Sequence, residues 1–350
     1  MARKPEADPD SPGGAHGAPA GRGADEALLQ RLEWTVLKRL DGLLQGDWRT
    51  LWRGSGLDLA DLREYQPGDD VRHIDWNVSA RLQQPHVRQF TEDRDASAWF
   101  LLDLSGSMDF GSVASDDADP AAPLRSKRAL AETFTAALAR VLTRHGNRVG
   151  AVLYRQGIEA VLPPRAGRAQ VLQLLARLRA PAPAKRAAAP EARHGTRLAD
   201  LLQHGLAVMP RRSVVFVLSD FISAPGWAAP LGRLAQRHDV LAVRLYDPAE
   251  LALPALGLLT VQDAETGEQL LLDTQDPGFR ARYAALATAH EAALRQQLAE
   301  AAVDVLELAT GDALLPALLR CVQLRRQRQR LPAPRRAPAW LGGGVATACT

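Results

Sequence analysis

Short apolar runs of strand length alternate with longer segments of helical periodicity between residues 98 and 325. The runs predict strands at 98–103, 148–154, 213–218, 239–245 and 303–308, and one near 157–162 follows a tight turn at Gly157. The longer segments predict helices at 124–144, 167–179, 197–208, 226–237, 277–300 and 312–325. Such alternation is typical of a parallel sheet covered by helices. We therefore expect an α/β protein with a doubly wound, mostly parallel sheet and helices on both faces.

The rest of the chain divides by composition. Residues 1–23 are rich in Pro, Gly and Ala and offer little apolar surface to offset the entropy of ordering, so they predict a disordered leader. Leucines at helical spacing from Ala24 predict one helix to about residue 45. A polar hairpin is expected near 258–273. The predicted domains are a leader at 1–23, a helix and charged extended segment at 24–96, a sheet domain at 97–325 and a basic disordered tail at 326–350.

The excess of basic over acidic residues lies at the C-terminal end of the chain. The formal charge is +3, but residues 313–350 hold seven arginines and no acidic residue, so the remainder counts 36 basic against 40 acidic residues, or −4. A solvated tail is favoured over a contact with nucleic acid or acidic lipid, because the body of the protein is slightly acidic. The sequence therefore argues against nucleic acid as a partner.

Cysteine content and hydropathy indicate in which cellular compartment the protein is expected. Cys321 and Cys349 form no C-x-x-C pair, which argues against a disulfide framework and a zinc knuckle. The N-terminus lacks an apolar segment of signal-peptide length, and no stretch of about 18 apolar residues is present. We expect no transmembrane segment and a cytoplasmic location.

Oxygen-bearing side chains gather where the predicted strands end. The run WFLLDLSGSMDF ends a buried strand and presents Asp103, Ser105 and Ser107 at alternate positions. Asp220 follows the strand at 213–218, and Thr196 precedes the helix at 197–208. Because ligands of such sheets bind beyond the carboxyl ends of the strands, these five residues are candidates for one site.

All five side chains offer oxygen, which is the donor that hard cations prefer. Magnesium takes about six oxygens and keeps several waters, so a few carboxylates and hydroxyls suffice, and manganese or calcium is an alternative. A further coordination position would be open to a carboxylate of another protein. Each residue alone has a structural explanation, since Ser105, Ser107 or Thr196 could cap a helix and Asp220 could accept backbone hydrogen bonds. Taken together, the set favours a metal site.

A second dense cluster lies upstream, within LREYQPGDDVRHIDWNVSARLQQPHVRQF at residues 62–90. Its charged residues and adjacent tryptophan are Arg63, Glu64, Asp69, Asp70, Arg72, His73, Asp75 and Trp76. No nucleophile and no further group of metal ligands lies at a spacing from them that would indicate a catalytic or metal site. A salt-bridged structural belt is favoured, and a partner-binding face is the alternative.

The strand-end pattern resembles the metal-ion-dependent adhesion site (MIDAS) of von Willebrand factor A domains, which reads D-x-S-x-S, then Thr, then Asp. The matching residues here are Asp103, Ser105, Ser107, Thr196 and Asp220. The run REYQPGDDVRHIDW followed by LLDLSGSM is more specific, and it is similar to the bacterial domain of unknown function 58 family (DUF58), which contains a von Willebrand A-like fold. The resemblance covers about residues 26–325. It implies a MoxR-type AAA+ ATPase as partner in assembling or activating other protein complexes.

Two functions follow from these observations. The first is a non-enzymatic, metal-dependent protein-interaction module that acts as adaptor for such an ATPase, with a client protein supplying a carboxylate to the metal. The alternative is a magnesium-dependent phosphatase or hydrolase with Asp103 as nucleophile. Enzymes of that kind usually carry an acid-base carboxylate two residues further on, where this chain has Ser105, and no phosphate-binding glycine loop is present.

Overall fold

The structure is a computed structural model that describes residues 58–66, 69, 71, 74–91, 97–112, 126–180, 195–262 and 268–329. The predicted leader at 1–23 and the helix expected at 24–45 lie outside the described residues. Helix α11 (Leu314–Gln329) runs a few residues beyond residue 326, where the basic tail was predicted to start. The remainder of the tail also lies outside the described residues.

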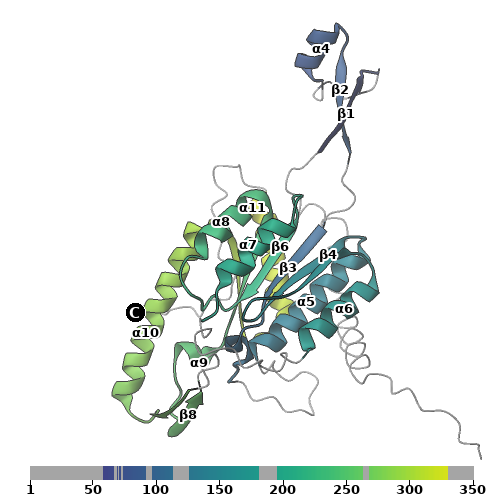
Figure 1. The fold of residues 1–350 in the computed structure, drawn as a ribbon. Helices are drawn as coiled ribbons and strands as arrows, with labels where there is room; N and C mark the ends of the chain where they lie inside the picture. The colour runs from purple at the N-terminus through teal and green to yellow at the C-terminus, as the bar shows by residue number, and fades with distance from the viewer. Residues whose placement is uncertain are drawn as a thin grey trace, which may run out of the picture.

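A six-stranded sheet forms the centre of the described fold (Figure 1). Its strand order is β10-β7-β6-β3-β4-β5, and every pairing is parallel except that of β4 with β5. The bounds are β3 Ser97–Asp103, β4 Arg148–Tyr154, β5 Ile158–Arg165, β6 Val214–Ser219, β7 Asp239–Tyr246 and β10 Asp304–Ala309. The prediction of a mostly parallel sheet is therefore confirmed.

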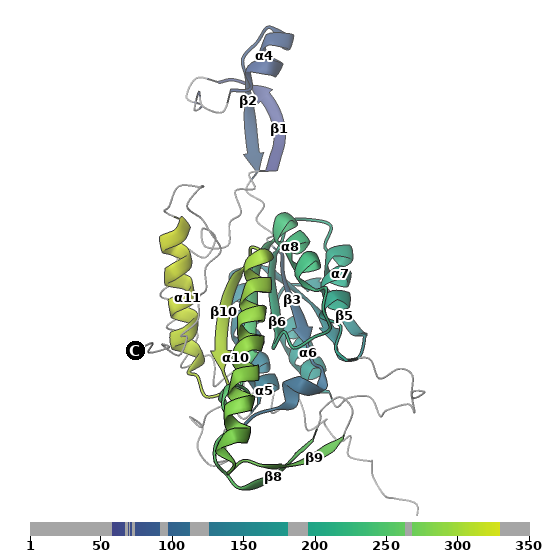
Figure 2. The same cartoon turned by 90° about the vertical axis from the view of Figure 1, so that its left-hand side faces the viewer.

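Helices cover both faces of this sheet (Figures 1 and 2). The first face packs against α5 (Lys127–Arg144), α6 (Arg168–Arg179) and α11, and the second against α7 (Leu198–Val208), α8 (Ala228–Arg237) and α10 (Pro277–Glu300). Alternate residues of β3 serve the two cores, with Phe100 and Leu102 on the first face and Trp99 and Leu101 on the second. Strands buried on both faces read as continuous apolar runs, which is why the sequence pattern located them.

The antiparallel strand β5 closes one edge of the sheet. A turn around Gly157 joins it to β4, as the sequence predicts. The register between β4 and β5 shifts between Val149 and Ala151, and the C-terminal half of β5 contains Pro163 and Pro164. Prolines are tolerated at such a position because an edge strand has a side without a neighbouring strand.

The upstream segment is more regular than the extended stretch predicted for it. Strands β1 (Asp58–Glu64) and β2 (His86–Thr91) pair antiparallel, and the short helix α4 (Trp76–Leu82) lies between them in the chain (Figure 1). The Asp75 carboxylate accepts hydrogen bonds from the backbone amides of Asn77 and Val78, which begins the helix. The sequence analysis expected an extended charged segment here and did not predict the pairing of the two strands or the helix α4 between them.

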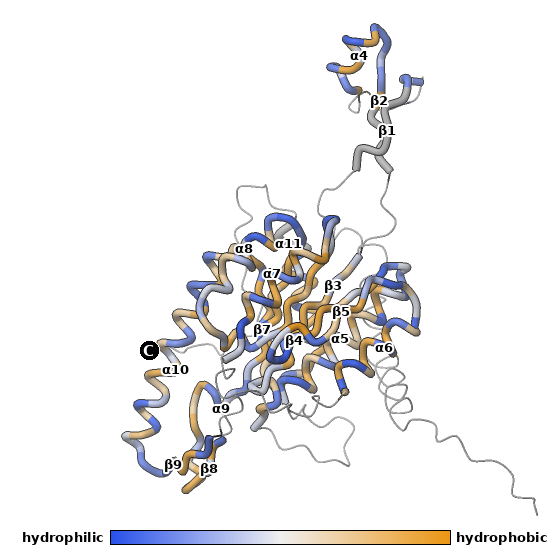
Figure 3. Tube along the Cα trace, in the orientation of Figure 1, coloured by the Kyte–Doolittle hydropathy of each residue, from blue (hydrophilic) through white to orange (hydrophobic). Residues whose placement is uncertain are grey.

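A second antiparallel hairpin consists of β8 (Leu258–Gln262) and β9 (Gln269–Asp273). The sequence predicts a hairpin here, but its expected polar character is wrong, because Leu258, Leu270 and Leu271 expose 68%, 57% and 65% of their surfaces. Figure 3 shows this hydrophobic colour at the hairpin, apart from the strands of the core. Within the described part of the chain, no helix combines the length and apolar character needed to cross a membrane.

Candidate metal centre

The candidate residues lie where the direction of the chain switches within the sheet. After β3 the chain continues to β4 on one side, and it later returns to β6 on the other side of β3. Asp103 is the last residue of β3, and Asp220 directly follows β6. Neighbouring parallel strands end at the same edge, so the two carboxylates meet at a switch point, where sheets of this kind bind ligands.

The Asp103 carboxylate is fully buried. Its Oδ1 accepts a hydrogen bond from the backbone amide of Ser105 at 3.0 Å, and its Oδ2 accepts one from the Ser219 hydroxyl at 2.7 Å. Burial, together with the nearby charge of Asp220, raises the pKa of Asp103 to about 6. A carboxylate in this position is ionised at neutral pH at a cost, which a nearby cation would reduce.

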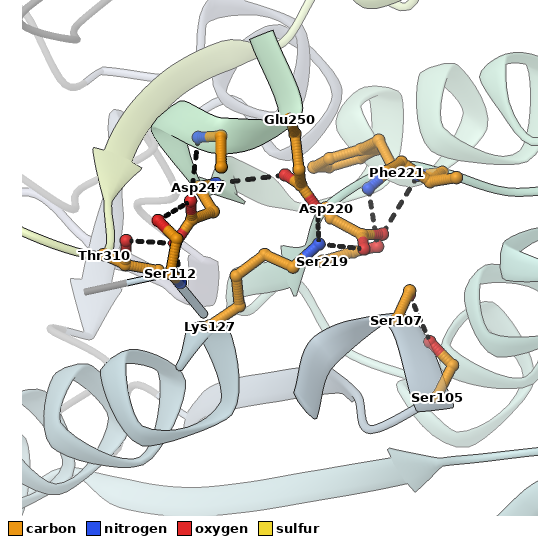
Figure 4. A network of polar contacts seen from close by, with 12 residues as sticks. Ser105, Ser107, Ser112, Lys127, Ser219, Asp220, Phe221, Asp247, Glu250 and Thr310 are labelled. Carbon is orange, nitrogen blue, oxygen red and sulfur yellow. Dashed lines mark hydrogen bonds and ion pairs between the residues drawn. The ribbon is translucent and has the colours of Figure 1, made fainter. Parts of the chain in front are cut away.

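Ser105 and Ser107 present their hydroxyls to each other across a tight turn. Their Oγ atoms are 3.2 Å apart (Figure 4), and the 3₁₀ helix η3 (Gly106–Asp109) begins directly after Ser105 and contains Ser107. Ser105 precedes η3 but its side chain makes no capping hydrogen bond there, so the capping explanation is wrong for this serine. The two hydroxyls remain available as oxygen donors beside Asp103.

Asp220 is held by a strained turn. Its Oδ1 accepts a hydrogen bond from the Ile222 amide at 3.0 Å, as the structural explanation from the sequence expects. Between them Phe221 has φ of 60°, in the left-handed region that bulky residues rarely occupy. The Phe221 ring is buried, and its centroid lies 5.2 Å from that of the Trp227 ring. The Phe221 amide donates a hydrogen bond to the Ser219 hydroxyl. These contacts hold the strained residue in place and thereby orient the carboxylate before it.

Lys127 is a residue of the site that the sequence analysis missed. Its side chain is fully buried, and its Nζ donates to Asp220 Oδ2 at 2.7 Å and to Glu250 Oε1 at 2.5 Å (Figure 4). Burial lowers the pKa of Lys127, but the two carboxylates outweigh it and raise the pKa above its usual value. Burial raises the pKa of Glu250 despite the neighbouring ammonium. Lys127 therefore stays charged, within hydrogen-bonding distance of a candidate ligand.

Thr196 joins the site indirectly. It is 6% exposed, and its carbonyl oxygen accepts hydrogen bonds from the Ser223 hydroxyl at 2.8 Å and the Ala224 amide at 2.9 Å. These bonds attach it to the loop that follows Asp220. The N-cap position of α7 belongs to Arg197 and not to Thr196, so the capping explanation is wrong for Thr196 as well.

A further buried carboxylate, that of Asp247, lies beside the site at the end of β7. Asp247 begins the short helix α9 (Pro248–Leu251) with a capping box that includes Glu250. Its side chain also accepts hydrogen bonds from Ser112 and from the Thr310 hydroxyl (Figure 4). Burial raises the pKa of Asp247, but these hydrogen bonds outweigh it and lower the pKa below its usual value. Asp247 thus fixes α9, which presents Glu250 to Lys127.

The upstream cluster divides into described and undescribed residues. Asp75 caps α4, and the Asp69 carboxylate accepts a hydrogen bond from the Gln66 amide at 2.9 Å, so both support local structure. Trp76 is 71% exposed on α4. The backbone of Arg63 pairs with Val87 in the hairpin. Asp70, Arg72 and His73 lie outside the described residues, so the choice between a structural belt and a partner-binding face stays a prediction.

The charges at the strand ends suit a divalent cation. Asp103, Asp220 and Glu250 carry three negative charges when ionised, and Lys127 carries one positive charge, which leaves two negative charges in a largely buried space. Among the described residues, no group of three or more His, Cys, Asp and Glu side chains is placed to hold a metal ion. A site here would instead combine carboxylate and hydroxyl oxygens, which is the donor chemistry of magnesium.

These features define a mixed α/β protein with a mostly parallel central sheet and a cluster of oxygen donors at its carboxyl edge. The chain belongs to the family described as "Protein of unknown function DUF58", which residues 61–293 match. The chain is 35% identical over 303 residues to the uncharacterized protein Rv1480 of Mycobacterium tuberculosis (strain ATCC 25618 / H37Rv), covering 86% of this chain and 90% of that protein. The uncharacterized protein Mb1516 of Mycobacterium bovis matches with the same values.

Solved structures give a fainter likeness. The conserved hypothetical protein BatB from Bacteroides thetaiotaomicron is 16% identical with a TM-score of 0.35, and the match covers 59% of this chain and 98% of that one. An aerotolerance-related membrane protein from Bacteroides fragilis NCTC 9343 is 14% identical with a TM-score of 0.35, covering 58% and 98%. At these TM-scores the likeness carries no argument about function.

Proposed function

We propose that this chain is a non-enzymatic protein-interaction module with a von Willebrand A-like fold, whose binding depends on a divalent cation. The observation that carries the proposal is the pair of buried carboxylates, Asp103 and Asp220, beside the hydroxyls of Ser105 and Ser107 at the switch point of the sheet. Magnesium, manganese or calcium bound there would supply a coordination position for a carboxylate of a client protein. The resemblance to DUF58 proteins suggests a MoxR-type AAA+ ATPase as the further partner, with this chain as adaptor.

Some of these side chains would bind the cation, and others orient the side chains that bind it. Asp103 and the two serines offer oxygens from one turn, while Asp220 directly follows β6 and Thr196 lies in the loop before α7. Ser219 and the Ser105 amide orient the Asp103 carboxylate. A cytoplasmic location, expected from the sequence, stays a prediction.

The first test is capture of a MoxR-type ATPase from the same organism by the full-length protein, in magnesium and in chelator. We expect capture to require magnesium and to fall at least about tenfold, or roughly 1.4 kcal/mol, in Asp103→Ala. The double variant Ser105→Ala/Ser107→Ala removes two donors without changing the charge and is expected to weaken capture as well. Asp109→Ala removes an exposed carboxylate of the same loop and is the matched control.

Two outcomes would contradict this function. Capture that is equal in magnesium, in chelator and in the Asp103 variant would remove the role of the cation. Hydrolysis of p-nitrophenyl phosphate by the wild type, lost in Asp103→Ala but kept in Asp109→Ala, would instead favour the enzymatic alternative. Circular dichroism of each variant separates these results from unfolding.

A further inference from the structure

Lys127 occupies a position that is unfavourable for a lysine by two independent criteria. It is the first residue of α5, where the positive end of the helix dipole repels a cation, and its side chain is fully buried. The first turn of α5 contains no acidic residue to offset this. The ammonium is therefore stabilised by the two carboxylates that reach it from other parts of the chain, Asp220 and Glu250.

The two carboxylates differ in what else they do. Asp220 is a candidate ligand of the cation and is 2% exposed. Glu250 is a residue of α9, and its other oxygen, Oε2, accepts a hydrogen bond from the Asp247 amide at 3.0 Å. The hydroxyl of Tyr283 on α10 donates to the carbonyl oxygens of Ala249 and Glu250 at 3.3 and 3.2 Å, which fixes α9. Glu250 is thus a firmly held partner for Lys127 whatever Asp220 does.

From this geometry we propose that Lys127 is a built-in competitor of the divalent cation for Asp220, and that Glu250 keeps the ammonium paired when Asp220 turns to the cation. This inference rests on the proposed function of the site. Lys127 acts here as a positioning residue, because it acts on the cation through Asp220. Removing its charge strengthens divalent-cation binding, because the site then holds one more uncompensated negative charge and Asp220 loses its rival partner.

The experiment is calorimetric titration of the full-length protein with Mg²⁺ and with Mn²⁺ at pH 8. We expect Lys127→Met to bind the cation about tenfold more tightly than the wild type. Glu250→Gln is expected to bind it several-fold more weakly, because Lys127 then depends on Asp220 alone. In the double variant Lys127→Met/Glu250→Gln, we expect Glu250→Gln to change the affinity for the cation less than it does alone. The reason is that Lys127 is no longer present to compete for Asp220.

Arg325→Met is the matched control. Arg325 is also a buried cation between two carboxylates, with 2.9 Å to Asp239 and 3.1 Å to Asp304. These are the first residues of β7 and β10, so this cluster lies at the opposite edge of the sheet from the candidate site. We expect Arg325→Met to lower the melting temperature while leaving the affinity for the cation unchanged.

The outcomes separate this inference from the proposed function. Tighter binding by Lys127→Met supports the inference, and so does binding that appears only in this variant. Wild-type binding that is unchanged or weakened in Lys127→Met overturns the inference and leaves the cation site standing. An unchanged affinity of Glu250→Gln overturns it too, even if Lys127→Met fails to fold. Absence of binding in every variant overturns both proposals.

Discussion

Asp103 shows how burial turns a single side chain into a source of pH dependence. Its pKa of about 6 lies above the ordinary 3.8, so between pH 4 and 6 the folded protein holds more proton at this position than the unfolded chain does. The contribution of Asp103 to stability is therefore most favourable at low pH. It is lost as the pH rises through about 6, where the buried carboxylate becomes charged.

Asp103→Asn keeps an amide oxygen that can accept from Ser105 but cannot ionise. In chelator, we expect the free energy of unfolding of the wild type to fall by about 2 kcal/mol relative to Asp103→Asn between pH 4 and 6.5. Urea unfolding at several pH values measures this difference. Parallel curves for the two proteins across that range would mean that Asp103 is not destabilised by burial and by Asp220.

At the scale of elements, one glycine sets how closely a helix approaches the sheet. A Cβ atom added to Gly205 in α7 would lie 2.8 Å from Cδ1 and 3.1 Å from Cδ2 of Leu101 in β3, whose side chain is fully buried. Glycine in a helix costs about 1 kcal/mol relative to alanine. The close contact with β3 explains why the helix nevertheless contains it.

Gly205→Ala is expected to lower the free energy of unfolding by about 1–2 kcal/mol, because the cost of overpacking exceeds the gain in helix propensity. Gly157→Ala is the control, since nothing lies within 4 Å of a Cβ at that position. Chemical denaturation of both variants compares them directly. Equal stability of the two variants would show that α7 shifts from β3 without cost.

Local sequence patterns predicted most helices and strands of the sheet domain but not every residue of the candidate site. Apolar runs and helical periodicity located the strands and helices of the sheet domain within a few residues, because each pattern is complete within one element. The Asp103–Ser107 turn was found for the same reason. The β1–α4–β2 unit was missed since its charges obscured the alternation, although Asp75 before α4 was a usable capping signal. Lys127 had no local signal, because its partners Asp220 and Glu250 stand 93 and 123 residues away.

For the whole molecule, apolar surface is divided between a buried core and an exposed hairpin. Leu271 of β9 is 65% exposed, whereas Leu306 of β10 is fully buried. We expect Leu271→Ser to change the free energy of unfolding by less than about 0.5 kcal/mol, because little apolar surface is buried there. Leu306→Ala should cost about 2–5 kcal/mol. Urea unfolding measures both, and a large loss in Leu271→Ser would show that the hairpin buries this leucine.

The paired prolines of β5 limit how whole molecules can join. The register between β5 and β4 shifts at residues 163 and 164, which stand opposite the single residue Gly150, so the regular ladder is interrupted here. Both are proline, and neither has an N–H to offer. A strand from another molecule therefore meets an interrupted row of donors along this margin. Prolines and a bulge on an edge strand both disfavour pairing with a strand of another copy, so we expect this edge of the sheet to stay unpaired between molecules.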